Sequence, residues 1–164
     1  APLRVGIISA ALTLPLSRLG LKGAQLKGEL TRRWSEVIDP TTRLTREISG
    51  LRPLEWETTF TQDLPRWNAT WGVDVFGSWE ETYYRFDQVE QVKLGTYVRP
   101  FAEVRLRPDV MLRVELPNVT GRGLRRTRTV YAGPRSTAPV AYVEDRDLDM
   151  GRMFYFRLRK TFGG

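Results

Sequence analysis

Apolar and polar residues alternate along much of the chain with a period of two. From Ala24 to Trp34 the even positions are mostly apolar, whereas the odd positions between them are polar or charged. Successive side chains of a β-strand point to opposite faces, so this pattern predicts strands with one apolar face. The alternation returns in stretches that begin near Leu54, Trp71, Val98, Val110 and Phe154. A weaker strand is expected at residues 4–14.

The predicted strands are long, and their polar face is heavily charged. Strands of soluble domains usually have about five or six residues, whereas a tilted membrane crossing takes about 9 to 11. One side of the predicted sheet carries Glu103, Arg105, Arg113, Glu115, Arg157 and Arg159. Such charges suit a barrel lumen, with the apolar face turned to lipid. We therefore predict an all-β fold: an antiparallel up-and-down meander of about seven long strands, forming part of a transmembrane β-barrel.

The connections between the predicted strands alternate in length. Short, turn-rich joints are expected at residues 15–22, 63–68 and 107–109, where glycine or proline occurs. Long polar connections are expected at 37–52, at 85–94 and from 117 to about 150. Outer-membrane barrels have short periplasmic turns and long external loops, so the pattern predicts a periplasmic C-terminus.

The register of one hairpin follows from its faces and charges. Cross-strand partners share a face, so we predict a three-residue loop at 107–109. This register places Leu106 opposite Val110, Val104 opposite Leu112 and Glu103 opposite Arg113. The next register that keeps the faces would oppose like charges.

Large aromatic residues fall mainly toward the ends of the predicted strands. The pattern favours a membrane-interface girdle, with the core of a soluble sandwich as the alternative. The residues expected in the girdle are Trp34, Trp56, Trp71, Trp79 and Phe154.

The chain is basic, with a formal net charge of +7, which favours anionic partners. The stretch 122–135 contains Arg125, Arg126 and Arg128. We interpret it as a solvated external loop close to lipopolysaccharide phosphates; a nucleic-acid patch is the alternative. The sequon at 118–120 is interpreted as a chance match.

The residue inventory excludes most catalytic and metal chemistry. The chain has no cysteine and no histidine, which removes thiolate zinc sites, cysteine nucleophiles and histidine bases. Asp145, Asp147 and Asp149 share the spacing at the start of a calcium-binding EF-hand, but the terminal glutamate of that motif is missing. We expect no catalytic residue, no metal and no cofactor, and hence no enzyme.

Several segments together resemble the C-terminal barrel strands of TonB-dependent receptors, and the resemblance covers nearly the whole chain. The segments are TLPLSRLGLKGAQL, ISGLRPLEWETTFTQDLP, WGVDVFGSWEETYYRFDQVE, LRPDVMLRVELPNVTGR, RTRTVYAGPRSTAPVAYVEDR and GRMFYFRLRKTF. The resemblance implies energised uptake of a scarce ligand, such as a ferric siderophore, through a barrel of about 22 strands with an N-terminal plug. Phe162 looks like the aromatic residue that the barrel assembly machinery recognises in this family.

The resemblance also implies where the protein lies and what it contacts. Residues 1–164 would be the C-terminal segment of a barrel domain in the outer membrane of a Gram-negative bacterium, without the plug and the earlier strands. Expected partners are outer-membrane lipid and lipopolysaccharide, the plug and the TonB complex, the assembly machinery and an unidentified small ligand, but no nucleic acid. Two rivals stay open: a complete adhesin or structural barrel of about eight strands, and a soluble basic β protein that binds nucleic acid or oligosaccharide.

Overall fold

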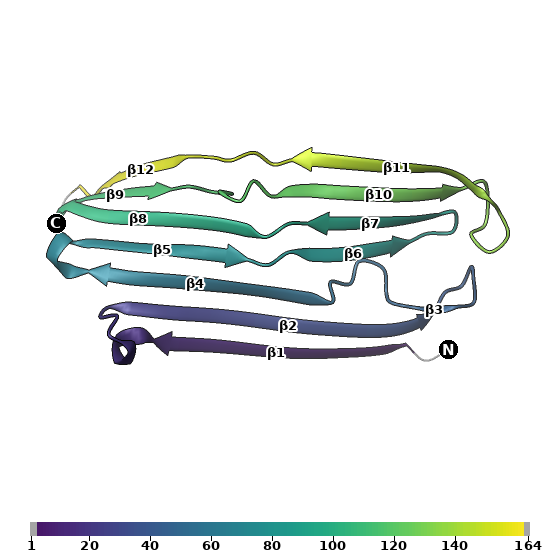
Figure 1. Ribbon diagram of the computed structural model, residues 1–164, viewed down its shortest axis with the longest axis horizontal. Coiled ribbons are helices and arrows are strands. Elements are labelled where there is room, and N and C mark those ends of the chain that lie inside the picture. The colour runs from purple at the N-terminus through teal and green to yellow at the C-terminus, as the bar shows by residue number, and fades with distance from the viewer. Residues whose placement is uncertain (1–2, 163–164) are drawn as a thin grey trace.

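The computed structural model describes residues 3–162, which form twelve strands and two short 3-10 turns (Figure 1). The elements before the middle of the chain are β1 (Arg4–Pro15), η1 (Leu16–Leu19), β2 (Ala24–Ile38), β3 (Thr45–Arg46), β4 (Leu54–Leu64), η2 (Pro65–Trp67), β5 (Ala69–Phe76) and β6 (Trp79–Tyr84). They are followed by β7 (Gln88–Leu94), β8 (Tyr97–Arg107), β9 (Val110–Glu115), β10 (Gly123–Tyr131), β11 (Val140–Asp149) and β12 (Tyr155–Lys160).

The strands form two antiparallel sheets. An eight-stranded sheet has the order β1-β2-β4-β5-β8-β9-β12, with β3 paired to β2, and a four-stranded sheet has the order β11-β10-β7-β6. The sheets lie end to end, so that β5 runs on into β6, β7 into β8, β9 into β10 and β11 into β12 (Figure 1). The all-β, antiparallel prediction is confirmed. The predicted single set of about seven strands is wrong, because there are twelve strands in two open sheets.

Several long strands are interrupted where the eight-stranded sheet meets the four-stranded sheet (Figure 1). Gly77, between β5 and β6, lies against the indole of Trp56, where an added Cβ would come within 2.3 Å of Nε1. Asn118, between β9 and β10, is buried with a φ of 59°. Its Nδ2 donates to the carbonyls of Arg122 at 3.2 Å and Gly151 at 2.5 Å. Asn118 thus fastens the β9–β10 interruption to the β11–β12 one, a role that leaves its side chain no room for a glycan.

The eight-stranded sheet has one apolar and one charged face, as cross-strand partners show. Partners share a face in an antiparallel ladder. One face holds the rows Leu14, Leu26, Phe60, Val73, Pro100 and Leu64, Ala69, Val104, Leu112, Leu158. The other holds the rows Thr13, Lys27, Thr59, Asp74, Arg99 and Asp63, Thr70, Glu103, Arg113, Arg157. The alternation in the sequence is therefore realised as two distinct surfaces.

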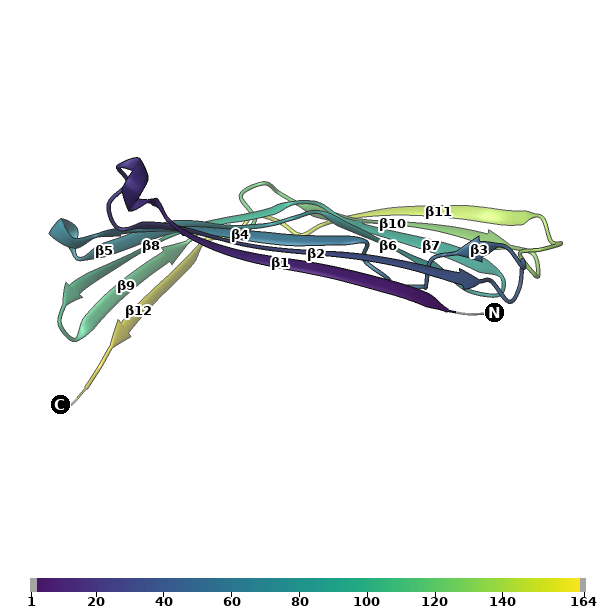
Figure 2. The same cartoon turned by 90° about the horizontal axis from the view of Figure 1, so that it is seen from below.

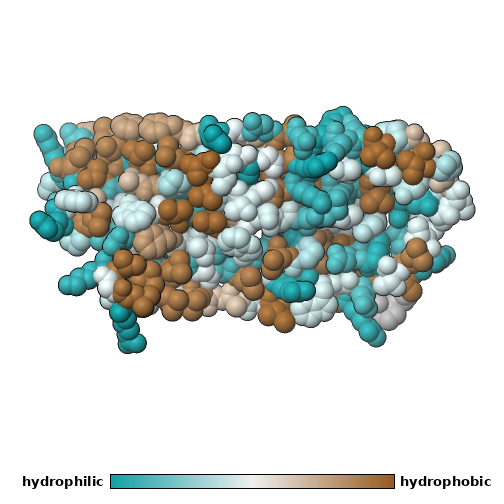
Figure 3. Space-filling view, viewed as in Figure 1, coloured by the Kyte–Doolittle hydropathy of each residue, from teal (hydrophilic) through white to brown (hydrophobic). Residues whose placement is uncertain are grey.

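The sheet is curved, and the apolar face is its convex side. In Figure 2, β9 and β12 bend away from the plane of the other strands toward one side. Figure 3 views the molecule from the opposite, convex side, and this face is largely hydrophobic over the half that contains β5 and β8. We call the two surfaces the convex apolar face and the concave charged face.

Burial is inverted relative to a soluble domain. Among the described residues, only Ala24 and Leu94 are buried apolar residues. The buried polar residues are more numerous: Ser35, Asp39, Asp74, Glu81, Gln88, Glu90 and Asn118. A soluble domain buries its apolar faces between two packed layers, whereas this chain forms a single layer whose apolar face is uncovered.

Two predicted connections are wrong. The expected long loop at 85–94 contains β7, so only residues 85–87 connect β6 to β7. The expected loop from 117 to about 150 contains β10 and β11, joined at 132–139. The four-stranded sheet has polar residues on both faces, so its strands show no apolar alternation by which they could be recognised. The connection after β2, which includes β3, is long as predicted.

The β8–β9 hairpin combines a confirmed register with an incorrect turn. Glu103 pairs with Arg113, and Val104 with Leu112, as predicted. The predicted pairing of Leu106 with Val110 is wrong, because Arg107 lies opposite Val110. The register shifts between Arg105 and Arg107. A bulge at Leu106 thus supplies the extra residue that the faces require, and the turn itself is shorter than three residues.

Candidate functional site: the concave charged face

The residues predicted to face a lumen share the concave charged face. Arg113 Nη1 lies 3.5 Å from Glu103 Oε2, and its Nε lies 2.5 Å from Glu115 Oε1. The guanidinium also stacks on Phe101, 4.2 Å from the ring centroid. Arg157 is the cross-strand partner of Arg113, while Arg105 and Arg159 both pair with Met111. The structure therefore brings all six predicted residues to one surface, with Arg113 at the centre of their ion pairs.

A second ion pair on this face lies deeper in the sheet. Asp74 is buried and accepts two hydrogen bonds from Arg99, at 3.0 Å from Nε and 2.7 Å from Nη2. Thr59 Oγ1 donates to the same carboxylate at 2.9 Å. Both Arg99 bonds go to Oδ2 and the Thr59 bond goes to Oδ1, so each oxygen of the buried carboxylate has a donor. The concave charged face is thus an ordered polar surface.

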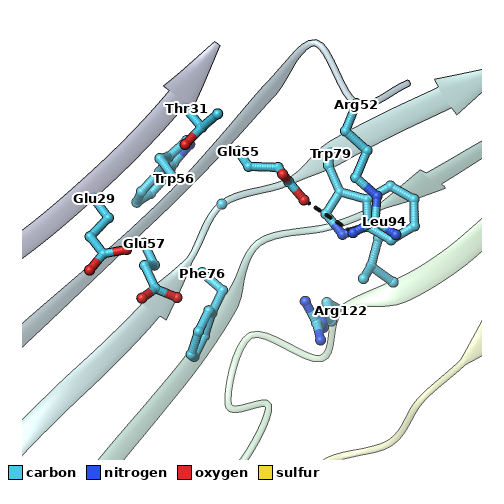
Figure 4. Close-up of a pocket in the computed structure, with 11 residues that line it drawn as sticks. Glu29, Thr31, Arg52, Glu55, Trp56, Glu57, Phe76, Trp79, Leu94 and Arg122 are labelled. Carbon is cyan, nitrogen blue, oxygen red and sulfur yellow. Dashed lines mark hydrogen bonds and ion pairs between the residues drawn. The ribbon is translucent and has the colours of Figure 1, made fainter. Parts of the chain in front are cut away.

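A groove crosses this face where the two sheets meet (Figure 4). It encloses about 430 Å³ and is lined by Glu29, Thr31, Arg52, Glu55, Trp56, Glu57, Phe76, Gly77, Trp79, Leu94 and Arg122. The Arg52 guanidinium lies over Trp79, 3.7 Å from the ring centroid. It also contacts Glu81 at 2.9 Å and Glu55 at 3.2 Å. One wall of the groove is therefore a fixed cation–π stack with its charge neutralised.

The other groove charges are not paired with each other. Glu29 and Glu57 are direct cross-strand partners, and neither has an ion-pair partner among residues 3–162. Arg122 stacks on Tyr97, 4.4 Å from the ring centroid, and its buried Nε makes no hydrogen bond. Like charges opposite one another destabilise a sheet, so this pair favours a cationic partner. The groove can hold a polar partner that presents opposite charges to its two ends.

Asp39 holds together two connections at one end of the molecule, the one after β2 and the one between β10 and β11 (Figure 1). This carboxylate is 1% exposed and contacts Arg46 Nε at 2.6 Å and Arg135 Nη2 at 2.5 Å. The amide groups of Thr41 and Thr42 donate to its Oδ1 at 2.8 and 3.1 Å. These hydrogen bonds hold the pKa of Asp39 well below its ordinary value, despite burial. Asp39 therefore ties the connection after β2 to the β10–β11 connection.

The arginine-rich stretch forms ion pairs within the four-stranded sheet. Arg125 contacts Asp145 at 2.5 Å, and Arg128 contacts Glu144 at 2.6 Å. Arg126 contacts Glu90 at 2.7 Å. The interpretation of this stretch as a loop is wrong, because the three arginines lie on β10 and pair with carboxylates of β7 and β11. They do not form the open basic patch that a phosphate would require.

The predicted interface aromatics occupy different surroundings. Trp34 covers Gly6, where an added Cβ would lie 2.1 Å from the indole, and Trp56 covers Gly77 in the same way. Trp71 packs against Phe60 with ring centroids 5.1 Å apart. Trp79 lies in the groove under Arg52. Phe154, between β11 and β12, is exposed, as is Phe162, which follows β12.

Several important residues were not singled out from the sequence. Asp39, Arg135 and the Arg52–Glu81 pair act across long sequence separations, and Asp39 and Arg135 are 96 positions apart. For the groove, the sequence offered one signal: Glu55 and Glu57 are two carboxylates on the same face of β4. Within residues 3–162, no group of three or more His, Cys, Asp or Glu side chains is arranged to hold a metal ion.

Comparisons with known protein families, with curated proteins and with solved structures gave no match to this chain. Among the described residues, none of the helical segments is long and apolar enough to cross a membrane.

Proposed function

We propose that the chain is part of the wall of an outer-membrane β-barrel of the TonB-dependent receptor type, which takes up a scarce ligand such as a ferric siderophore. The observation that carries the proposal is the inverted burial: an uncovered convex apolar face, a concave charged face and almost no buried apolar core. Lipid would cover the first surface and water the second, as in transmembrane barrels.

The height of the apolar band supports a membrane crossing. On β4 and β5 the convex face holds five successive rows, from Leu64 opposite Ala69 up to Trp56, which lies beside Gly77, and Gln62 and Thr58 are the only polar members of these rows. Beyond them, the outward surface turns polar in the four-stranded sheet. The crossing would therefore use the eight-stranded sheet, and the four-stranded sheet would extend above the membrane with the loops that Asp39 fastens.

The concave charged face would then line the lumen. Its charged side chains would contact the water, plug or ligand inside the barrel. The groove with Glu29, Glu57 and Arg122 would offer charges without ion-pair partners to a plug or a passing ligand. The free outer edges of β1 and of β11 and β12 would pair with further strands of the same barrel.

Cell fractionation and uptake measurements test the proposal. The full-length gene product is expected in the outer membrane, with a gel mobility that changes on heating. A screen of ferric siderophores in cells with and without this gene should find one whose uptake needs both the gene and the TonB complex. A monodisperse protein in the soluble fraction that binds oligonucleotide would contradict the proposal. Insertion without any energised uptake would instead favour a structural barrel.

A further inference from the structure

The 3-10 turns η1 and η2 lie at the same end of the eight-stranded sheet, opposite the connections that Asp39 holds (Figure 1), and both carry exposed apolar and basic side chains. In η1, Leu19 is 77% exposed and is preceded by Arg18; in η2, Trp67 is 71% exposed and is preceded by Arg66. Lys22 follows η1 and is also exposed. None of the three cations has an ion-pair partner among residues 3–162. We call these five residues the turn cluster.

The two turns are held next to each other by hydrogen bonds. The amide of Asp63 donates to the carbonyl of Gly23 at 2.9 Å, and Gln62 Nε2 donates to the carbonyl of Lys22 at 3.3 Å. Gly23 has a φ of 71°, and a Cβ there would lie 2.7 Å from the Asp63 carbonyl. The close approach of the turns is thus built into the backbone.

A small groove of about 280 Å³ opens at these turns. It is lined by Lys22, Asp63, Leu64, Pro65, Arg66 and Trp67. The Asp63 carboxylate accepts a hydrogen bond from Thr70 at 2.7 Å. Leu64 belongs to the last row of the convex apolar face, and η1 projects from the sheet on that same side (Figure 2). The groove therefore lies where the apolar face ends, with its cations at the rim.

We propose that this groove binds an anionic glycerophospholipid of the leaflet that faces the turns, such as phosphatidylglycerol. The inference rests on the proposed function, because it needs the convex apolar face to meet lipid. Leu64, Pro65 and Trp67 contact the start of an acyl chain, while Lys22 and Arg66 donate hydrogen bonds to the phosphate. Tryptophan suits this boundary because one edge of its ring is apolar and its N–H is polar. The groove favours an anion because its two cations, Lys22 and Arg66, outnumber its one carboxylate, Asp63, which already accepts the hydrogen bond from Thr70.

Native mass spectrometry of the full-length protein, purified in detergent and titrated with phosphatidylglycerol, tests the site. We expect the double variant Lys22→Gln, Arg66→Gln to weaken retention of the lipid by about thirtyfold, since each basic residue near an anionic surface contributes about fivefold. The matched control, Arg43→Gln, Arg85→Gln, removes the same charge from exposed positions at the other end of the sheet and should bind as the wild type does. Phosphatidylcholine should be retained far less in all three proteins.

Heat-dependent gel mobility, measured on the same samples, separates the possible failures. If all three proteins are folded barrels and the double variant retains phosphatidylglycerol as the control does, the lipid site is wrong and the barrel stands. Equal retention of phosphatidylcholine by the wild type would also overturn the site. If the wild-type protein does not insert into membranes at all, the proposed function fails, and the lipid site fails with it.

Discussion

Replacing Asp39 with asparagine is expected to release the connection after β2 from the rest of the structure. The change removes the charge that holds Arg46 and Arg135, whose side chains are only 17% and 8% exposed. Removing one partner of a buried ion pair costs about 3–5 kcal/mol. If that cost falls on local opening, amide hydrogen exchange in residues 40–46 should accelerate by about two orders of magnitude or more. Hydrogen exchange with mass spectrometry on the membrane-inserted, full-length protein measures this.

A matched substitution and a pH series serve as controls. Asp87→Asn makes the same change in the neighbouring β6–β7 connection, where the side chain is exposed, and should leave exchange unaltered. Because the pKa of Asp39 is lowered in the folded state, its contribution is complete above the ordinary carboxyl pKa of about 4. It is lost only as the pH falls below that range toward the lowered pKa. Unchanged exchange in the Asp39→Asn protein would show that the carboxylate does not fasten these connections.

Placing an arginine on the convex apolar face should have the second large effect. Val73 lies in the middle one of the five rows on the convex apolar face, between Phe60 on β4 and Pro100 on β8. A charge at the midplane of the lipid face of a barrel costs about 2–4 kcal/mol. We therefore expect Val73→Arg to lower the urea concentration at which the protein unfolds from phospholipid vesicles, as followed by gel mobility without heating.

The opposite face offers a direct comparison. Thr61 lies on β4 opposite Gln25 and Gly72, on the concave charged face. Thr61→Arg adds the same side chain to a surface that already holds arginines in water, so its unfolding midpoint should stay close to that of the wild type. Equal effects of the two substitutions would contradict the assignment of lipid and water to the two faces.

The sequence predicted the faces of the eight-stranded sheet because apolar and polar residues alternate there. The pairing of Glu103 with Arg113 could also be predicted, since the alternative registers either mixed the faces or opposed like charges. Leu106 could not be recognised as a bulge, because β8 ends at Arg107, too soon for the shifted alternation to appear in the sequence.

The four-stranded sheet was missed for a physical reason. Arg125 and Arg128 on β10 lie on opposite faces, and each is paired with a carboxylate of β11. A sheet with charged residues on both faces has no apolar alternation, so its strands resemble polar loops in sequence. The Asp39 cluster was missed because its partner Arg135 is distant in sequence, and nothing in the local pattern indicates which residues meet.

The assignment of lipid to the convex apolar face and water to the concave charged face can be tested directly along β4. This chain contains no cysteine, so single cysteines introduced at residues 58–62 of β4 can each carry a nitroxide label, with any cysteines elsewhere in the full-length protein replaced. In lipid vesicles, labels at the even positions should be relaxed mainly by oxygen, which concentrates in hydrocarbon. Labels at Thr59 and Thr61 should be relaxed mainly by a water-soluble nickel complex. Accessibility without a period of two, or with the two reagents exchanged, would contradict a membrane barrel with a charged lumen.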